Sequence, residues 1–279
     1  MLENMWSIFI ERKDFFLSLL WEHLEISLLA IGIAVLIGGL VGILISEFQK
    51  TSKPTLGFIN FLYTIPSISM LGFLIPFSGI GNATAVIALT VYALLPMVRN
   101  THTGIVNVDP VLLEAAKGMG STKLQILLKI KLPLAMPIII SGIRNMVTMT
   151  IALAGIASFI GAGGLGVAIY RGITTNNTAM TMVGSLLIAL LALVMDMLLG
   201  FIEKRMNKRS IKDKKVNKVM ALVSIGLCIV IVIGTVVSRK KQDIIHIATK
   251  PMTEQYVLGE MLKLLIEQDT NLNVELTQG

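Results

Sequence analysis

Long runs of apolar residues, separated by short polar segments, make up most of this 279-residue chain. Such runs predict membrane-spanning helices, because crossing about 30 Å of hydrocarbon takes about 20 helical residues that satisfy their own backbone hydrogen bonds. The pattern predicts six spans, at residues 24–46, 56–77, 84–98, 136–157, 180–202 and 219–237. We therefore expect an all-α polytopic membrane protein over most of the chain.

The composition agrees with this interpretation. Hydrophobic residues make up 54% of the chain and charged residues 15%, whereas a soluble domain carries about 25% charged residues. The net charge of +7 is explained by cytoplasmic loops that face anionic lipid, so membrane lipid is an expected partner and nucleic acid is not. Cys228 is the only cysteine, and the three histidines have no ligand-like spacing, so we expect no disulfide and no metal site.

Basic residues in the short loops predict the orientation of the spans, because Lys and Arg accumulate on the cytoplasmic side. Segment 203–218 holds eight Lys or Arg residues against two acids, which places it in the cytoplasm. Counting back, the expected cytoplasmic segments are 47–55 and 99–133, and the expected external ones are 1–23, 78–83 and 158–179. The first 23 residues read as an amphipathic external segment with no cleavable signal peptide. The basic triplet at 239–241 opposes this orientation.

The cytoplasmic segment 110–133 differs from its apolar neighbours because it has helical spacing and several lysines. Gly120 weakens helix formation and permits a bend. A second short helix is expected to begin at Ser121 or Thr122 as the N-cap and to end or kink at Pro133. Two short helices joined by an elbow would form a compact knob that fits a cleft on a cytoplasmic partner.

This segment resembles the EAA loop of bacterial ABC importer permeases. The matching positions, all at the family's spacing, are Glu114, Ala115, Ala116, Gly120, Ile130, Leu132 and Pro133. In that family the loop is a coupling helix that docks in a groove of the ATP-binding subunit. The other interpretation is an ordinary amphipathic surface helix that matches by chance.

Two further stretches are similar to permeases for glycine betaine, carnitine and choline. They are "SFIGAGGLGVAIYRGI" at 158–173 and "YTIPSISMLGFLIP" in the second span, and the likeness extends over about residues 20–205. The resemblance implies a type I ABC permease domain at 24–205 in a bacterial cell membrane. It also implies a permease homodimer, a dimer of ATP-binding subunits that carries the ATP and Mg, and a small trimethylammonium substrate. Ergothioneine is a further candidate, and no catalytic residue or cofactor is expected on this chain.

The C-terminal part predicts a different fold. A basic linker at 206–218 and an additional tether helix at 219–238 precede an expected parallel βαβ unit within 242–279, with strands at 244–249 and 273–277 around a helix at 253–268. This unit resembles the start of a truncated extracellular α/β substrate-binding domain; the alternative is a small disordered tail. The resemblance implies a turn close to the ligand, formed by Lys250, Pro251, Met252, Thr253, Glu254 and Gln255.

Within the spans, ionisable and aromatic side chains are candidates for the translocation path. Charged groups at membrane depth are costly, so Arg144 and Asp196 are expected either to pair near the path or, as we favour, to have a structural role near the cytoplasmic ends. Aromatic rings can bind a quaternary ammonium by cation–π attraction, although packing is their more common role. The aromatic candidates are Tyr63 and Tyr92, with Phe61 and Phe73 weighed beside them.

Two other functional classes compete with the importer interpretation. A secondary carrier would show inverted repeats with interrupted helices, and the sequence has no clear internal repeat. A membrane-anchored solute sensor would need no coupling loop. The complete EAA pattern therefore favours a permease that a separate ATPase drives.

Overall fold

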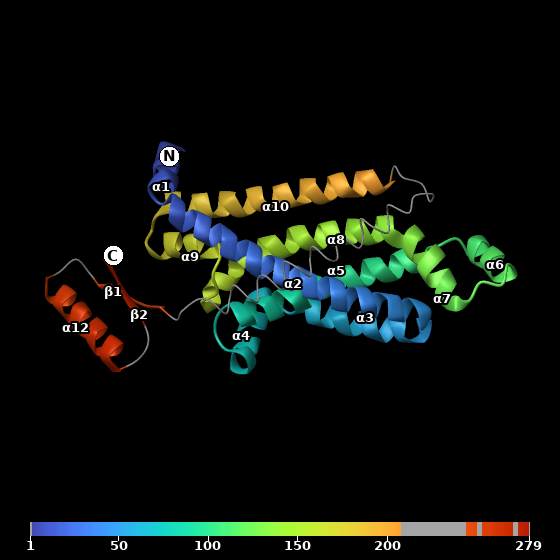
Figure 1. The fold of residues 1–279 in the computed structure, drawn as a ribbon, viewed down its shortest axis with the longest axis horizontal. Helices are drawn as coiled ribbons and strands as arrows, with labels where there is room; N and C mark the ends of the chain where they lie inside the picture. Colours follow the sequence, from blue (N-terminus) through green and yellow to red (C-terminus); the bar gives the residue numbers. More distant parts are fainter. Residues whose placement is uncertain (1, 208–243, 250–252, 270–272, 279) are drawn as a thin grey trace. The chain divides into compact units, whose positions relative to one another are not determined.

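The computed structural model describes residues 2–207, 244–249, 253–269 and 273–278 (Figure 1). The chain divides into two units, Met1–Val230 and Ile231–Gly279, which are described separately. The helices of the first unit are α1 (Leu2–Glu11), α2 (Lys13–Glu47), α3 (Gln49–Thr64), α4 (Ser67–Ser78), α5 (Asn82–Val106), α6 (Pro110–Gly118), α7 (Lys123–Ile126), α8 (Leu132–Ala154), α9 (Gly166–Thr174) and α10 (Thr178–Asn207). A π-helical segment, η1 (Leu127–Lys131), joins α7 to α8, and a 3₁₀ segment, η2 (Gly155–Ile160), follows α8.

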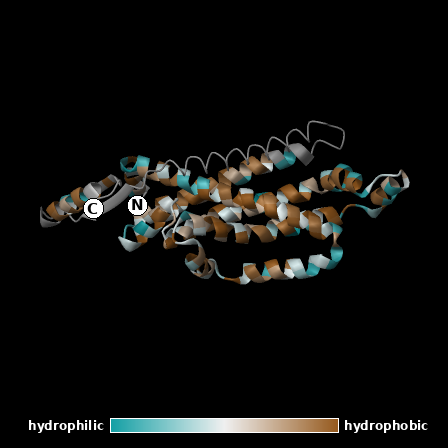
Figure 2. Cartoon of the chain, turned by 60° about the horizontal axis from the view of Figure 1, so that its bottom comes forward, coloured by the Kyte–Doolittle hydropathy of each residue, from teal (hydrophilic) through white to brown (hydrophobic). Residues whose placement is uncertain are grey.

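Among the described residues, four helical runs are long and apolar enough to cross a membrane. They are Lys13–Glu47, Asn82–Val106, Lys123–Ile160 and Thr178–Phe201, and α3 with α4 counts as a fifth if a bent pair is one span. These helices are apolar over most of their length (Figure 2). They include the predicted spans 24–46, 84–98 and 136–157, although the first helix begins well before residue 24. The predicted sixth span lies outside the described residues.

The bundle packs closely because small residues lie where the helices cross. A Cβ atom on Gly42 of α2 would lie 2.6 Å from the Cβ of Thr101 of α5, so this contact requires glycine. One turn further along α5, Gly104 lies against Ala135 of α8. Without a strong hydrophobic force between helices in lipid, such close backbone approach is a main source of helix association.

The predicted second span, 56–77, falls on two helices, α3 and α4, that form a bent pair. The chain bends by 98° between α3 and α4. Pro66 causes the break, because it lacks an N–H and disfavours helical backbone in the residue before it. Ile65 is accordingly extended, with φ −69° and ψ 128°.

The second short helix does not end at Pro133, because the chain stays helical from Lys123 to Ile160, although its direction changes between α7 and α8 (Figure 1). Pro133 lies in the first turn of α8, where a missing N–H costs little. Directly before it, the N–H of Leu132 donates to the carbonyl oxygen of Leu127, five residues earlier. The π-helical segment thus carries the helix past the proline.

The second unit contains β1 (Ile244–Thr249), α12 (Thr253–Asp269) and β2 (Asn273–Gln278). The two strands are parallel, with Ile244 paired to Asn273 and Thr249 to Gln278, which confirms the predicted βαβ order. Of the predicted ligand turn, residues 250–252 lie outside the described residues, and Thr253 to Gln255 form the first turn of α12.

Candidate functional site

The coupling segment, defined here as residues 110–133, begins with a capped helix. The Asp109 carboxylate accepts a hydrogen bond from the N–H of Val111 at 2.9 Å, and Pro110 occupies the first turn. Both features favour a helix start. Within α6, Glu114 and Ala115 are exposed, and Ala116 is buried. The helix thus packs on Ala116 and presents Glu114 outward.

The elbow of the coupling segment is set by backbone geometry. Gly120 has φ +81°, a conformation that glycine adopts without strain. The N–H of Ser121 donates to the carbonyl oxygen of Ala116 at 3.0 Å, which closes α6. Thr122 then forms a capping box with Gln125, at 3.3 Å and 2.9 Å, and starts α7. The predicted bend at Gly120 and the predicted N-cap at Thr122 are both confirmed.

The coupling segment exposes large apolar side chains. Val111 is 68% exposed, Met119 79% and Leu124 64%. The segment lies at the end of the bundle opposite α1 and α9 (Figure 1). An apolar, lysine-bearing knob of this kind has the form of a surface that a partner covers.

Two connections join the coupling segment to the bundle. The Lys131 ammonium lies 2.5 Å from the Glu47 carboxylate at the end of α2, and this pair is only partly exposed. The other connection is the unbroken helical run into α8, in which Ile130 and Leu132 are half-buried and Pro133 is exposed. The segment is therefore attached to the bundle as a continuation of one of its helices.

Arg144 and Asp196 form an ion pair between α8 and α10. Two guanidinium N–H groups of Arg144 donate to the two carboxylate oxygens of Asp196 at 2.5 and 2.6 Å, and a third donates to Glu203 at 3.2 Å. Gly200 provides the space, because a Cβ there would lie 3.0 Å from the guanidinium carbon. Planar two-point contact of this kind fixes orientation as well as charge. The geometry ties α8 to α10.

The other two path candidates, Tyr63 and Tyr92, lie together at the break between α3 and α4. Their ring centroids are 5.9 Å apart in an edge-to-face arrangement. The Tyr92 hydroxyl donates to the carbonyl oxygen of Ile65, and the Tyr63 hydroxyl donates to the sulfur of Met149 at 3.3 Å. Phe61 and Phe73 are both largely exposed. The structure thus brings the two tyrosines together and leaves the phenylalanines out of the cluster.

The glycine-rich turn between η2 and α9 closes the opposite end of the bundle. Gly164 has φ +93°, and its N–H donates to the Glu22 carboxylate at 3.2 Å, while the N–H of Gly163 donates to Asn82 at 2.8 Å. Beside it, the buried His23 ring is 2.9 Å from the carbonyl oxygen of Ile151. The partners from α2 and α5 were not predicted, because spacing along the chain does not reveal them.

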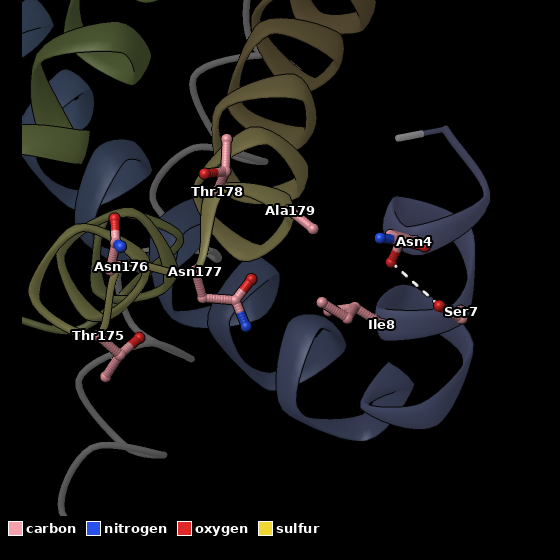
Figure 3. Close-up of a pocket in the computed structure, with 8 residues that line it drawn as sticks. All are labelled: Asn4, Ser7, Ile8, Thr175, Asn176, Asn177, Thr178 and Ala179. Carbon is pink, nitrogen blue, oxygen red and sulfur yellow. Dashed lines mark hydrogen bonds between the residues drawn. The ribbon is translucent and has the colours of Figure 1, made fainter.

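An open pocket of about 540 Å³, which the sequence did not predict, lies between α1 and the turn before α10 (Figure 3). Its lining is mostly amides and hydroxyls: Asn4, Ser7, Ile8, Thr175, Asn176, Asn177, Thr178 and Ala179. Asn176 has φ +54°, and the Asn177 side chain accepts from the N–H of Met180 at 3.0 Å. The adjacent asparagines thus form the turn that precedes α10. Two consecutive asparagines are the sequence signal that could have predicted this turn.

Comparison with known proteins identifies the class of this fold. Residues 17–208 match the family described as "Binding-protein-dependent transport system inner membrane component", and the chain belongs to this family. The fold resembles a chain of the MetNI methionine ABC transporter, with a TM-score of 0.66 and 24% identity over 70% of this chain and 98% of that one. A chain of an amino acid ABC transporter gives a TM-score of 0.61 at 22% identity, covering 71% and 97%. The protein is therefore a membrane-embedded ABC importer permease subunit.

Individual relatives are more similar in sequence. The osmoprotectant import permease protein OsmW of Salmonella typhimurium is 41% identical over 208 residues, 73% of this chain and 97% of that protein. The carnitine transport permease protein OpuCB of Listeria monocytogenes is 38% identical over 195 residues, 70% and 89%. The ergothioneine transport permease/ergothioneine binding protein EgtU of Helicobacter pylori is 35% identical over 246 residues, 85% of this chain and 44% of that protein. The predicted resemblance to this group of permeases is confirmed.

Proposed function

We propose that this chain forms the pathway of an ATP-driven importer for small trimethylammonium compounds. The substrate class is supported by the relatives, whose names include transport of carnitine, glycine betaine, choline and ergothioneine. The observation that carries the proposal is the coupling segment, which combines the full EAA pattern with an exposed apolar surface. A secondary carrier or a solute sensor would have no use for such a surface.

Docking of a separate ATP-binding subunit on the coupling segment is the central step. The exposed Val111, Met119 and Leu124 would fill an apolar groove, and the outward Glu114 would pair with a cation at its rim. The partner subunits would bind and hydrolyse ATP with Mg, and this chain would need no cofactor of its own. Two copies of the permease are proposed to face each other, because one bundle supplies only half of a pathway.

The proposed orientation follows from charge. The coupling segment faces the cytoplasm, and the N-terminus and the C-terminal unit face outside, with lysine-rich ends against anionic lipid. The coupling segment and the end of α2 are joined by Lys131 and Glu47, so they belong to one side of the membrane. By its charge, the strongly basic segment 203–218 is proposed to lie on the cytoplasmic side as well.

The C-terminal βαβ unit is proposed to begin a substrate-binding domain, with Lys250 to Gln255 beside its ligand. The EgtU alignment covers 246 residues, more than the match to the permease family, and EgtU is named both as a permease and as a binding protein. This chain spans 44% of EgtU. A fused permease and receptor is therefore the arrangement that the comparison favours, with ergothioneine the first compound to test.

The test of coupling uses charge and shape changes in the coupling segment. Glu114→Arg and Gly120→Trp are expected to abolish binding of the ATP-binding subunit and uptake while membrane insertion stays normal. Tryptophan at position 120 is strained by the positive φ. Lys50→Glu is the matched control, because it reverses an exposed charge at the start of α3, beside the same end of the bundle. Unchanged uptake in both coupling variants would refute the role.

The substrate is tested by uptake into proteoliposomes that hold the full natural chain with its ATP-binding subunit. Radiolabelled glycine betaine, carnitine, choline and ergothioneine are compared with and without ATP. Uptake of one compound that depends on ATP supports the proposed substrate class. Absence of uptake for all four, with ATP hydrolysis intact, would contradict that class and leave the permease assignment standing.

A further inference from the structure

The break between α3 and α4 is held from α5 by one hydroxyl group. Pro66 prevents helical continuation, so Ile65, the residue that follows the end of α3, has an extended backbone. The Tyr92 hydroxyl donates a hydrogen bond to this carbonyl oxygen. Tyr92 is 6% exposed and lies in the middle of α5, whereas Ile65 at the break is half-buried and Pro66 is exposed. At membrane depth a carbonyl without a donor is costly, so this bond stabilises the bent arrangement.

The same break is connected to α8 by a second tyrosine. Tyr63, in the last turn of α3, donates its hydroxyl to the sulfur of Met149 at 3.3 Å, and its ring meets that of Tyr92 edge to face. Ile65 and Met149 also pack against one buried apolar cluster that includes Tyr92. Three elements of the bundle therefore meet at the point where the chain bends by 98°.

Met149 lies on the helix that begins in the coupling segment. The run from Lys123 to Ile160 is helical throughout, so a displacement at α7 reaches Met149 without crossing a loop. Met149 contacts Tyr63, which lies next to the break, so the displacement reaches the break through this contact. Interrupted helices near mid-membrane commonly border the substrate pathway of transporters. The contacts thus form a continuous connection from the coupling segment to the break.

We propose that Tyr92 is a positioning residue for transport, and that the contact between Tyr63 and Met149 passes movement of α8 to the break between α3 and α4. In the resting arrangement the Tyr92 hydroxyl holds the bend. When α8 moves, Tyr63 moves with Met149 and the two helices change their angle at Ile65. The inference rests on the proposed function in one respect, namely that an ATP-binding subunit drives the coupling segment.

The test measures the break itself and needs no transported compound. In the full natural chain with its ATP-binding subunit, reconstituted in lipid, Cys228→Ser removes the one cysteine of this sequence and Ser69→Cys places one in the exposed first turn of α4. The rate of labelling by a water-soluble maleimide is measured with and without Mg-ATP. We expect ATP to change this rate in the parent, and Tyr92→Phe to reduce the change about tenfold, the usual effect of one lost hydrogen bond. ATP hydrolysis is expected to continue.

Two further variants and a melting measurement separate positioning from stability. Tyr63→Phe, at a residue that is 39% exposed, is expected to weaken the ATP-dependent change as well, and serves if Tyr92→Phe does not fold. Tyr170→Phe is the matched control, because Tyr170 also has an edge-to-face aromatic partner, Phe159, but lies on α9. It is expected to keep the parent's change. A variant that only loses stability would show a lower melting temperature with the ATP-dependent change retained.

Two outcomes would overturn the inference. The first is that ATP does not alter the labelling rate in a parent that hydrolyses ATP. The second is that Tyr92→Phe and Tyr63→Phe both show the same ATP-dependent change in labelling rate as the parent. A parent that binds no ATP-binding subunit would instead refute the proposed function, so the two failures are distinguishable.

Discussion

The crossing of α2 and α5 gives a prediction that contrasts two glycines on one helix. Gly42→Ala places a methyl group where the Cβ would lie 2.6 Å from the Thr101 Cβ and 3.0 Å from the Val98 carbonyl oxygen. Real Cβ atoms do not approach so closely, so the helices must separate. Gly39→Ala meets a single atom, the Met97 methyl, at 3.4 Å, which is ordinary contact. The same substitution should therefore be harmful at one position and tolerated three residues away.

The expected size follows from the geometry. Overpacking of a tight contact costs about 1–3 kcal/mol. For a chain of this size, 1 kcal/mol corresponds to about 2–4 °C of melting temperature, so Gly42→Ala should lower it by about 2–12 °C. Gly39→Ala should change it by less than about 2 °C, because alanine is also the better helix former. Because both variants are glycine-to-alanine changes on α2, the difference between their melting temperatures reports the closeness of the helix crossing.

The assay is thermal unfolding of the purified permease in detergent at a fixed heating rate, because such unfolding is commonly irreversible. Size-exclusion chromatography after heating reports the folded fraction. Equal melting temperatures for the two variants would show that the crossing of α2 and α5 is looser than described. A larger loss for Gly39→Ala would refute the reasoning outright.

Three further predictions follow from side-chain contacts. Arg144→Met should lower the yield of folded permease, because Asp196 loses its two-point partner between α8 and α10, and Arg144→Lys should give a yield between that of Arg144→Met and the parent. The double variant Arg144→Met with Asp196→Leu should give a higher yield than Arg144→Met alone. Equal yields in all three variants would contradict the pairing. Thr122→Ala removes the capping box at a cost of about 1 kcal/mol and should weaken capture of the ATP-binding subunit on immobilised permease, whereas Thr122→Ser should not. Trp6 and Trp21 are the two tryptophans of this sequence, and both are largely exposed. Brominated lipids should quench the tryptophan fluorescence of each single-tryptophan variant. Quenching by aqueous iodide alone would exclude contact of these side chains with lipid.

Much of the fold was predictable from the sequence because the signals are local. The span at 84–98 lies within α5, and the start of α7 at Thr122 follows from a capping pattern contained in four residues. The strand order of the second unit was likewise visible, because the alternation of apolar residues and the intervening helix are both close in sequence.

The features that were not predicted depend on contacts between distant residues. Pro66 signals a possible break, but the bend of 98° is fixed by packing on α5 and by Tyr92. At Pro133 the same residue type breaks nothing, because the π-helical segment before it shifts the hydrogen bonds. A proline alone therefore does not distinguish a bent span from a continuous one. The partners of His23 and Glu22 are more than a hundred residues away, at 128 and 142 positions along the chain.

The continuity of the helix from Lys123 to Ile160 has a consequence for how the chain tolerates changes in length. Its 38 residues correspond to about 57 Å, so one end necessarily extends beyond a hydrocarbon core of about 30 Å. Inserting or deleting one residue between α7 and the bundle would turn the coupling segment by about 100° around the helix axis and shift it by about 1.5 Å. The docking surface would then face a different direction. In this protein the number of residues before the membrane sets the angle at which a partner can bind.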